Sequence, residues 1–509
     1  MITFLVCVAI LIVGYFTYGT IVDKILAPND AIVTPAKRLA DGVDYVELSW
    51  PKVLLTQFLN IAGLGPIFGA ILGALFGPVA FIWITLGCLF VGSVADMLVG
   101  FISMRHDGLS ITELVALYLG KHTQWFMIVF TFVLLVLVGV TFTMAPANWL
   151  QYRFSIPGGL IELANGTNVP WIWVLIIFAY FVFATIVPVE ALIAKLFPPL
   201  SIAMLAACIL LLFAMFFYDG AGIGSMMEFR LDFNLHPQGL TFFPFIFTTI
   251  ACGAVSGFHA TKSPMMARCI GLESEAKRVF FGSMIIEGIV ALMWAAITMA
   301  FFGEGLFTTH LNAAGNYVNQ IQFHGGQGGV VNYMSNAMLP PWLAYLIIFT
   351  AVIIFPITSA DTGFRSVRLM LADAFKLDQS KVISRILLSI PIFAVAWVLT
   401  WVNFQTIWQF FAWSNLSIAA IALWMGGRYL ATRKKNYWIA ILPAAVTSMG
   451  AIAYILQVQY TFGIDGTISN IIGVVFGLVL LILFVMTAGK APEKLAHLIS
   501  DAEKEHGVA

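Results

Sequence analysis

Long apolar runs separated by short polar connections make up most of the chain. Thirteen of these runs are close to the ~20 residues that an α-helix needs to cross a bilayer. They cover residues 2–22, 52–76, 79–104, 125–148, 170–188, 192–217, 241–262, 279–302, 342–364, 384–402, 405–426, 437–458 and 467–488. The pattern predicts an all-α integral membrane protein with about thirteen transmembrane helices. Two of the runs, 52–76 and 241–262, are interrupted near the middle by polar residues, glycine and proline.

The composition supports this class and excludes others. Of the 509 residues, 61% are hydrophobic and 10% are charged, whereas about a quarter of a soluble domain is charged. The formal net charge is zero, so no basic field favours nucleic acid. The five cysteines have no metal-type spacing, which indicates small core residues rather than metal ligands or disulfides. We therefore expect no metal site, no cofactor and no nucleic-acid partner.

Lysine and arginine predict the orientation, because the cytoplasmic loops of membrane proteins are enriched in them. When the thirteen spans are threaded with the N-terminus outside, all of the 25 Lys and Arg except Arg153 and Arg230 fall on the inner side. A wrong number of helices would mix the two sides. The asymmetry predicts an external N-terminus and a cytoplasmic C-terminus, which carries Lys490, Lys494 and Lys504.

The run that begins at Phe242 stops behaving as a helix near its middle. Gly253, Ser256 and Gly257 lie within five residues of one another, and Pro264 follows. In a helix interior glycine costs ~1 kcal/mol and proline ~3 kcal/mol relative to alanine. Because unpaired backbone groups cannot face lipid, a break at this depth has to face protein or a water-filled cavity. We interpret the segment as a discontinuous helix that lines a solute site; a kink stabilised by neighbouring helices is the alternative.

The run 52–76 carries the same kind of interruption, with Asn60, Gly63, Gly65 and Pro66 inside it. The two broken runs have opposite directions in the predicted topology. Interrupted segments at corresponding places of two inverted halves point to a transporter binding site.

The spans then fall into two sets of five with opposite orientation. The first repeat is predicted over residues 52–217 and the second over 241–426, each beginning with its broken helix. Residues 1–51, an N-terminal helix and a cytoplasmic loop, precede them, and residues 427–509, two helices and a cytoplasmic tail, follow. Five-plus-five inverted repeats with broken first helices describe the leucine-transporter type of fold.

Two glycine patterns indicate a structural role rather than a binding site. Gly65, Gly69, Gly73 and Gly77 recur at steps of four and give a flat helix face against which another backbone can pack; a gating hinge is the alternative. The run Gly325–Gly329, in a long predicted outer loop, lacks the G-K-[ST] of a phosphate loop. We interpret it as a flexible linker.

Three stretches resemble one known family. NIAGLGPIFGAILGALFGPVAF from Asn60, GAVSGFHATKSPMMARCI from Gly253 and ITSADTGFRSVRLMLAD from Ile357 are similar to motifs of the carbon starvation protein A (CstA) family. The resemblance extends through most of residues 45–430. It implies the amino acid–polyamine–organocation superfamily with its five-plus-five fold, and the uptake of peptides, or of pyruvate with protons, when carbon is scarce. Membership leaves the substrate itself open.

Two carboxylates lie deep within predicted spans, where a charge is costly and marks a functional candidate. Asp96 lies nine residues before Arg105, and Glu287 lies nine residues after Arg278. Each is therefore roughly 13 Å along its helix from the cytoplasmic end. The two occupy the second helix of each repeat. We expect at least one of them to couple transport to protons; a hydrogen-bonded structural carboxylate is the alternative.

A cluster of oxygen ligands lies in the span 342–364. Thr358, Ser359 and Asp361 bring hydroxyl groups and a carboxylate close together, and such ligands suit a hard cation. In leucine-transporter-type folds the corresponding helix supplies hydroxyls to a sodium site against the first broken helix. We expect a coupling-ion site here, with an interfacial ion pair between Asp361 and Arg365 as the alternative.

His259 and Lys262 follow the second break and are candidates to bind the solute. The imidazole could carry a proton, and the lysine could attract a carboxylate, as could the N–H groups of a half-helix. The alternatives are a packing histidine and a lysine at a cytoplasmic helix end. The predicted substrate site comprises Asn60, Gly63, Gly65, Gly253, Ser256, Gly257, His259 and Lys262.

These features predict a secondary active transporter in the bacterial inner membrane. It would take up peptides or a small carboxylate such as pyruvate and use a proton or sodium gradient, since no Walker motif is present. An amino-acid transporter of the same fold is the alternative. A channel or a membrane enzyme fits less well, because the internal repeat suits a rocking carrier and the chain has no HExxH or GxSxG motif. We expect a small-molecule substrate and lipid as partners, with the oligomeric state left open.

Overall fold

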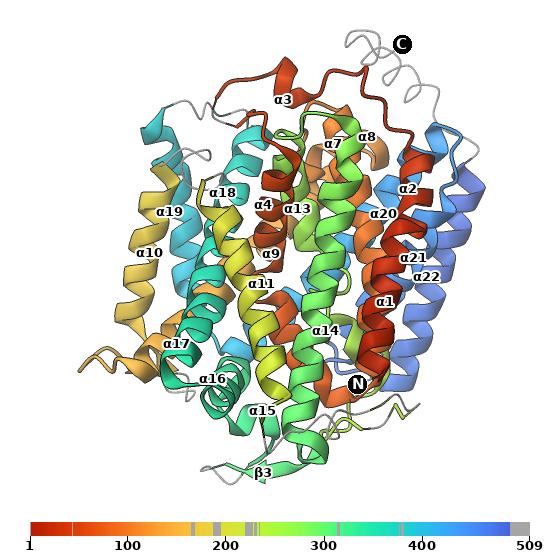
Figure 1. The fold of residues 1–509 in the computed structure, drawn as a ribbon. Helices are drawn as coiled ribbons and strands as arrows, with labels where there is room; N and C mark the ends of the chain where they lie inside the picture. Colours follow the sequence, from red (N-terminus) through yellow and green to blue (C-terminus); the bar gives the residue numbers. More distant parts are fainter. Residues whose placement is uncertain are drawn as a thin grey trace.

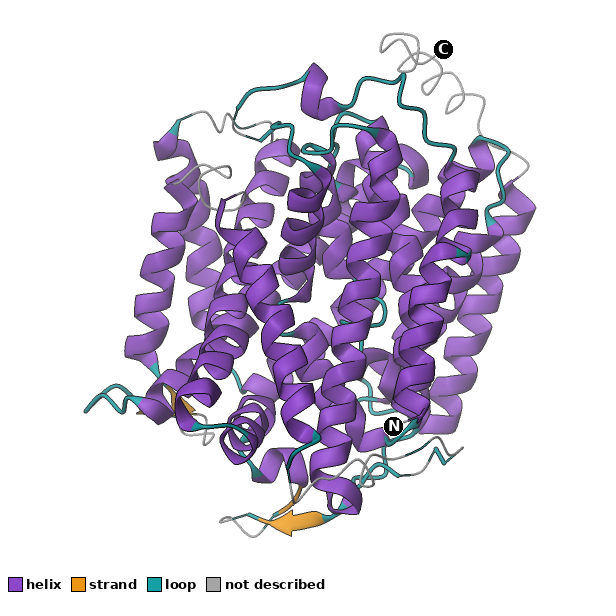
Figure 2. Cartoon of the chain, in the orientation of Figure 1, coloured by secondary structure: helices purple, strands orange, loops and turns teal. Residues whose placement is uncertain are grey.

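Helices occupy nearly all of the apolar segments in the computed structural model of the protein (Figures 1 and 2). The structure describes residues 2–42, 44–163, 168–186, 195–218, 228, 232–233, 235–312, 316–375, 377 and 381–488. Arg230 and the three C-terminal lysines, which enter the orientation prediction, lie outside these residues.

The first half of the chain forms helices at the six predicted spans that it contains. Their bounds are α1 Ile2–Phe16, α2 Tyr18–Leu26, α3 Pro35–Arg38, α4 Trp50–Ala62, α5 Ala70–Gly73, α6 Val79–Gly87, α7 Ser93–Arg105, α8 Ile111–Leu119, α9 Lys121–Arg153, α10 Trp171–Ile186 and α11 Lys195–Met215. A π-helical turn at Gly65–Gly69 precedes α5, and another at Cys88–Gly92 joins α6 to α7.

The second half repeats this succession of long helices. Their bounds are α12 Phe242–Thr249, α13 Gly257–Ala267, α14 Gly282–Phe302, α15 Gln320–Phe323, α16 Gly326–Met338, α17 Pro341–Ile348, α18 Phe355–Phe375, α19 Val382–Leu399, α20 Phe404–Thr432, α21 Trp438–Gln457 and α22 Gly466–Ala488. π-Helical turns at Lys277–Phe281 and Phe349–Ile354 lead into α14 and α18.

Ten helices in the described part of the chain are long and apolar enough to cross a membrane. An eleventh span is the pair Trp50–Ala62 and Gly65–Phe76, which is bent by 51°. The two other predicted spans correspond to α10, which is a shorter apolar helix, and to the discontinuous pair α12 and α13. The chain is therefore a multi-pass membrane protein. The total of thirteen spans and the repeat boundaries stay predictions.

The broken helices lie in the middle of the bundle. α13 packs against α4, α7 and α20, and α4 also contacts α11, α14 and α18. α9 runs beside them against α18 and α20. α21 and α22 pack together at one edge of the bundle, and α10 and α19 lie at the other (Figure 1). Protein thus surrounds the unwound segments, as the absence of lipid-facing backbone groups requires.

The segment 23–51 crosses one end of the bundle, the end at which α13 finishes (top of Figure 1). Leu48 forms an isolated bridge with Ile270. Glu273 accepts hydrogen bonds from Nε of Arg105 at 2.5 Å and from Nη2 at 2.7 Å. Paired charges and backbone contacts therefore close this face, which is the predicted cytoplasmic one.

The opposite end carries small polar elements (bottom of Figure 1). Strand β3 Thr309–Leu311 pairs antiparallel with β4 Tyr317–Asn319, and β1 Ile161–Glu162 pairs antiparallel with β2 Asn168–Val169.

The interpretation of Gly325–Gly329 as a flexible linker is wrong, because the run forms a turn and the first residues of α16. A Cβ at Gly329 would lie 1.9 Å from the carbonyl oxygen of His324. Close packing in a tight turn therefore explains this glycine, and composition alone does not distinguish such a turn from a linker.

Candidate solute and coupling-ion site

The first broken helix turns at Gly63. α4 ends at Ala62, Gly63 adopts a φ of 42°, and the chain resumes in a π-helical turn that starts at Gly65. Glycine suits this backbone because a Cβ would clash at positive φ. Beside the turn Asn60 is fully buried, and neither Oδ1 nor Nδ2 has a hydrogen-bond partner among the described residues. Since an unsatisfied buried polar group costs ~1–3 kcal/mol, this carboxamide is a candidate ligand for a solute or an ion.

The second broken helix is unwound between α12 and α13. Gly253, with a φ of 89°, donates its N–H to Oε1 of Glu287 at 3.0 Å. At the start of α13, the N–H of Phe258 donates to Oδ1 of Asn415 at 2.6 Å. The carboxamide does the work of an N-cap, although it comes from another helix. Side chains of α14 and α20 thus satisfy backbone N–H groups on either side of this break.

Asn415 was not among the predicted site residues. Its Oδ1 also accepts from Oγ of Ser256 at 3.2 Å, and its Nδ2 donates to Sγ of Cys252 at 2.9 Å. α20 approaches so closely that a Cβ on Gly257 would lie 2.2 Å from the carbonyl oxygen of Asn415. The available signal was an amide side chain inside the apolar run 405–426, a position where a polar group needs a partner.

The two breaks touch each other. A Cβ on Gly65 would lie 2.1 Å from the Cβ of Cys252, and one on Gly73 would lie 2.3 Å from Cδ1 of Ile250. The glycine face of the first broken helix therefore packs against the unwound part of the second, which confirms the predicted packing face. The void between them is about 10 Å³. The predicted solute site between the breaks is thus closed in this structure.

Aromatic rings cover the first break from the other side. A Cβ on Gly63 would lie 2.6 Å from the ring of Phe142 in α9. The same ring makes edge contacts with Phe258 and Phe411, at centroid distances of 6.4 and 5.9 Å. On this side, aromatic packing therefore covers the first break.

His259 joins the two carboxylates that were predicted to couple transport. Its Nδ1 is hydrogen bonded to Oδ2 of Asp96 at 3.0 Å, and its Nε2 lies 3.0 Å from Oε2 of Glu287. The second contact is close but not aligned as a hydrogen bond, so its attraction is mainly electrostatic. All three side chains have 0% exposure. α7, α13 and α14 therefore meet at one buried cluster of charge-bearing groups beside the second break.

This cluster can exchange protons without exposing a charge to lipid. An imidazolium between two carboxylates is paired on both sides, and a change in the protonation of any member alters the attraction among all three. Glu287 also holds the N–H of Gly253, so its charge acts directly on the unwound backbone. Within the described residues no group of three or more His, Cys, Asp or Glu side chains is arranged to hold a metal ion.

The hydroxyl cluster of α18 reaches the first break through Ser359. Its Oγ donates to the carbonyl oxygen of Leu59 at 3.3 Å. Thr358 instead donates within its own helix, to the carbonyl oxygen of Phe355 at 2.9 Å. Asp361 is buried, and its Oδ2 has no hydrogen-bond partner in the described part of the chain. Of Thr358, Ser359 and Asp361, Ser359 is the residue whose described hydrogen bond reaches the first broken helix.

Lys262 lies between the second broken helix and α18. Its Nζ donates to Oγ of Ser366 at 3.1 Å and lies 4.9 Å from the ring centre of Phe258. It also interacts electrostatically with Asp361. Because the side chain is 0% exposed, Lys262 is not a solvated lysine at a helix end. The structure therefore connects it to the hydroxyl cluster and not to the unwound segment.

Two cavities lie on the β3 side of the bundle. The larger, of about 580 Å³, is bounded by α5, α12, α20 and α21, and the smaller, of about 350 Å³, by α9, α16 and the start of α20. Gln405 lines both, whereas Trp408 lines the larger cavity and also the void between the breaks. The ring of Trp408 lies 5.8 Å from the ring of Phe68, which belongs to the first broken helix and lines the smaller cavity. None of these lining residues was predicted as a site residue.

One protein family matches a large part of this chain. The family described as "Carbon starvation protein CstA" matches residues 1–164 and 159–324. The chain belongs to the CstA family. An uncharacterized membrane protein of Haemophilus influenzae is 38% identical over 341 residues, which cover 59% of this chain and 91% of that protein. The peptide transporter CstA of Escherichia coli is 25% identical over 567 residues, which cover 86% of this chain and 78% of the relative.

The fold is also similar to that of solved transporters. A Na⁺-coupled sialic acid symporter in a substrate-bound outward-open state has a TM-score of 0.50 and 13% sequence identity, and the match covers 93% of this chain and 98% of that structure. At such identity the likeness shows the fold alone, which is of the leucine-transporter type. Membership of the family, in which the Escherichia coli relative is named a peptide transporter, supports a membrane transporter rather than an enzyme.

Proposed function

We propose that this CstA-family protein is a secondary active transporter that takes up peptides or a small carboxylate such as pyruvate and couples uptake to protons. The observation that carries the proposal is the position of His259, fully buried between Asp96 and Glu287, while Glu287 also holds the N–H of Gly253. The name of the Escherichia coli relative, a peptide transporter, supports the class of solute.

Protonation of the cluster would act on the contact between the breaks. With Glu287 charged, the imidazole and the N–H of Gly253 both face a carboxylate, and this stabilises the closed packing. A proton that reaches Glu287 or Asp96 removes one of the charges and weakens the hold on the unwound segment. α12 and α13 can then move against α4 and expose the site, in a rocking motion of one repeat against the other.

The proposed orientation places the segment 23–51 in the cytoplasm of a bacterial inner-membrane protein, with the N-terminus outside. Three basic residues lie on or beside this segment, namely Lys37, Arg38 and Arg105. Lys37 pairs with Glu47, and Arg105 pairs with Glu273. Positive charge on this face supports the orientation. Both cavities then open to the outside, and the paired cytoplasmic face corresponds to a closed inner gate.

A sodium ion at the first break is the second candidate for the coupling ion. Asn60 has two unpaired buried atoms beside the turn, and Ser359 brings a hydroxyl to the same helix. Amide, hydroxyl and backbone carbonyl oxygens together suit Na⁺. An amino-acid substrate remains the alternative to a peptide, since both carry the same terminal groups.

Uptake into proteoliposomes tests the proposal. Labelled di- and tripeptides, pyruvate and amino acids are offered with an imposed pH gradient, with a sodium gradient, or with neither. We expect accumulation above equilibrium with the pH gradient, loss of this accumulation in His259→Gln, and normal accumulation in His122→Gln, which alters an exposed histidine at the start of α9. Equilibration without accumulation would indicate a channel, and sodium-driven accumulation would assign coupling to the first break.

A further inference from the structure

The larger of the two cavities on the β3 side has a lining with an unusual chemistry. Its walls come from α5, the segment before α12, the second half of α12, β4 and α15, the first turns of α20, and the end of α21. Seven of the lining side chains are carboxamides, namely Gln238, Asn319, Gln322, Gln405, Gln409, Gln457 and Gln459. Among the described residues, no Asp, Glu, Lys or Arg lines it. At about 580 Å³, it falls within the ~300–1,000 Å³ of small-molecule sites.

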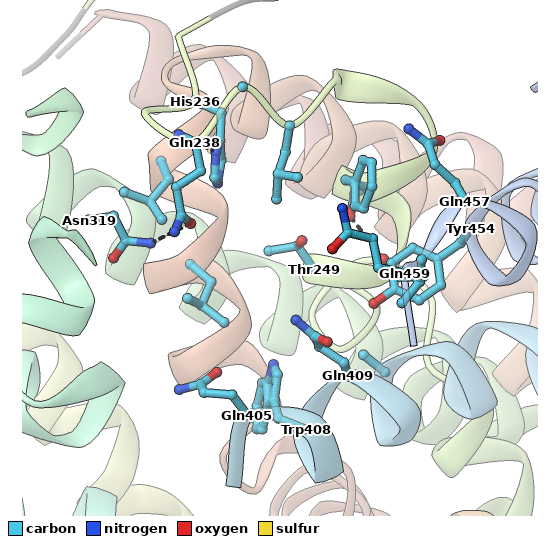
Figure 3. A pocket seen from close by; sticks show the side chains of 18 of the residues that line it. His236, Gln238, Thr249, Asn319, Gln405, Trp408, Gln409, Tyr454, Gln457 and Gln459 are labelled. Carbon is cyan, nitrogen blue, oxygen red and sulfur yellow. Dashed lines mark hydrogen bonds between the residues drawn. The ribbon is translucent and has the colours of Figure 1, made fainter. Parts of the chain in front are cut away.

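The carboxamides on one wall are satisfied by one another. Nδ2 of Asn319 donates to Oε1 of Gln238 at 3.0 Å, and Nε2 of Gln238 donates to Oε1 of Gln322 at 3.4 Å. Figure 3 shows the first two on one side of the cavity, with Gln457 and Gln459 on the other. The amide groups of this first wall therefore hydrogen bond to one another, and this network explains why the wall is rich in amides.

The wall formed by α20 and α21 has unpaired groups. Nε1 of Trp408, Oε1 of Gln409 and Oε1 of Gln457 are buried atoms that have no hydrogen-bond partner among the described residues. All three residues line the cavity (Figure 3). They offer one donor and two acceptors, which complement the C=O and N–H groups of an amide. Leaving such atoms unpaired is unfavourable, so the wall is suited to a ligand that carries both kinds of group.

The absence of charged lining residues restricts the ligand further. Moving a carboxylate or an ammonium group out of water is strongly unfavourable unless it is paired. The described part of the lining offers no ion partner, and burial keeps the imidazole of His236 neutral by lowering its pKa to about 4. Charged ends of a solute would therefore remain in the water at the cavity mouth, while its uncharged middle enters.

The cavity is continuous in its lining with the breaks. Trp408, Thr248 and Thr249 line both the cavity and the small void beside Cys252. A solute held against α20 and α21 would thus lie beside Trp408, which also lines the void between the unwound segments.

From these contacts we propose that the cavity is an outer subsite, which binds the secondary amide groups of a short peptide before the breaks open. The inference rests on the proposed function, because a site that binds the solute before transport is expected only in a transporter. In this subsite Nε1 of Trp408 donates to a peptide carbonyl, and the amide oxygens of Gln409 and Gln457 accept peptide N–H groups. The charged termini take no part in recognition here.

Equilibrium binding to the purified full-length chain in detergent tests the subsite. The probes are trialanine, N-acetyl-alanyl-alanine amide, which has no charged terminus, and pyruvate. We expect the blocked peptide to bind as tightly as trialanine. Trp408→Phe and Gln457→Leu should each weaken its binding about fivefold to tenfold, the effect of one lost hydrogen bond. Trp424→Phe is the matched control, because Trp424 lies on the same helix as Trp408 but does not line the cavity, and its Nε1 donates to Oγ of Ser448 in α21.

Several outcomes would overturn the inference. They are failure of the blocked peptide to bind when trialanine binds, unchanged affinity in both Trp408→Phe and Gln457→Leu, an equal loss in Trp424→Phe, and an equal loss for pyruvate. A thermal melt of each variant establishes that it is folded. Because binding is measured without a gradient, weakened binding in a protein that shows no proton-driven accumulation would overturn the proposed function alone. Normal accumulation with unchanged affinities would overturn the subsite alone.

Discussion

The two broken helices differ in how their unwound backbones are held. At the second break, Glu287 and Asn415 accept the N–H groups of Gly253 and Phe258. At the first, the described contacts are mainly those of packing, and Asn60 keeps both polar atoms unpaired. A break whose backbone N–H groups are satisfied by side chains is stable without a ligand. A buried amide side chain without hydrogen-bond partners is instead a candidate to bind a ligand.

In the proposed mechanism, this difference gives the two breaks separate tasks. The second break is connected through Glu287 to His259 and Asp96, so it can respond to a proton. The first break, with Asn60 and the nearby hydroxyl of Ser359, can respond to a solute or a cation. The two are packed together at Gly65 and Cys252, so the proposed coupling would act through this contact.

The largest expected effect is at Glu287. Glu287→Ala removes the acceptor of the Gly253 N–H and leaves His259 and Asp96 without their second charge, and breaking a buried pair costs ~3–5 kcal/mol. Glu287→Gln keeps an oxygen for Gly253 and should lose less stability, yet it should abolish the pH dependence of uptake. Thermal unfolding in detergent and liposome uptake measure the two effects. Proton-driven accumulation that survives in Glu287→Gln would separate the carboxylate from coupling.

A smaller loss of stability is expected at Asn415. Asn415→Ala leaves the N–H of Phe258 unsatisfied in a buried position, at a cost of ~1–3 kcal/mol. Asn403 provides a matched control, because its side chain caps α20 at an exposed position by accepting the N–H of Gln405 at 2.9 Å. Asn403→Ala should cost about 1 kcal/mol or less. Equal losses of unfolding free energy would show that Asn415 does not anchor the second break.

Local chemistry predicted the breaks but not their connections. Gly63 and Gly253 could be identified because glycine and proline in the middle of a membrane span usually mark a break in the helix. Asp96 and Glu287 could be identified because charged residues within membrane spans are rare. That both carboxylates meet His259 could not be predicted, because the contact joins α7, α13 and α14 across 163 and 28 residues of chain. Periodicity along a single helix carries no information on which neighbour it faces.

Other features depend on how the helices pack and could not be predicted from the sequence. Asn415 is an isolated polar residue in an apolar helix, and its role follows from the close approach of α20 to Gly257. Lys262 was expected beside a solute, yet it lies against α18. The closed contact between the breaks is a property of one conformation, and hydropathy is the same in every conformation of the chain.

The first break should show the opposite balance of effects. Asn60→Ala removes a buried amide that has no partner in the described residues, so the free energy of unfolding should change by less than about 1 kcal/mol. Uptake should nevertheless fall about tenfold or more, if Asn60 supplies a hydrogen bond to solute or cation worth ~1.4 kcal/mol. Thermal unfolding and initial uptake rates of the same preparation provide the measurement. A loss of stability like that of Asn415→Ala, with normal uptake, would remove the contrast between the breaks.

The smallest effect is expected at His236, which lies outside both breaks and beside the ring of Phe76 at 4.7 Å. Burial lowers the pKa of this imidazole from 6.5 to about 4. Between these two values the unfolded chain binds more protons than the folded one, so the folded state loses stability as the pH falls from 6.5 towards 4. In His236→Gln the melting temperature should therefore decline less between pH 7 and pH 5 than it does in the unchanged protein.

The same variant separates acid sensitivity of the fold from proton coupling. His236 has no described contact with Asp96, His259 or Glu287, and its backbone belongs to the segment before α12. Uptake driven by a pH gradient should therefore keep its pH dependence in His236→Gln, although the stability profile changes. If instead this substitution abolished the pH dependence of uptake while His259→Gln preserved it, protons would act at the outer cavity. The second break would then be a structural joint, and the division of tasks between the breaks would be wrong.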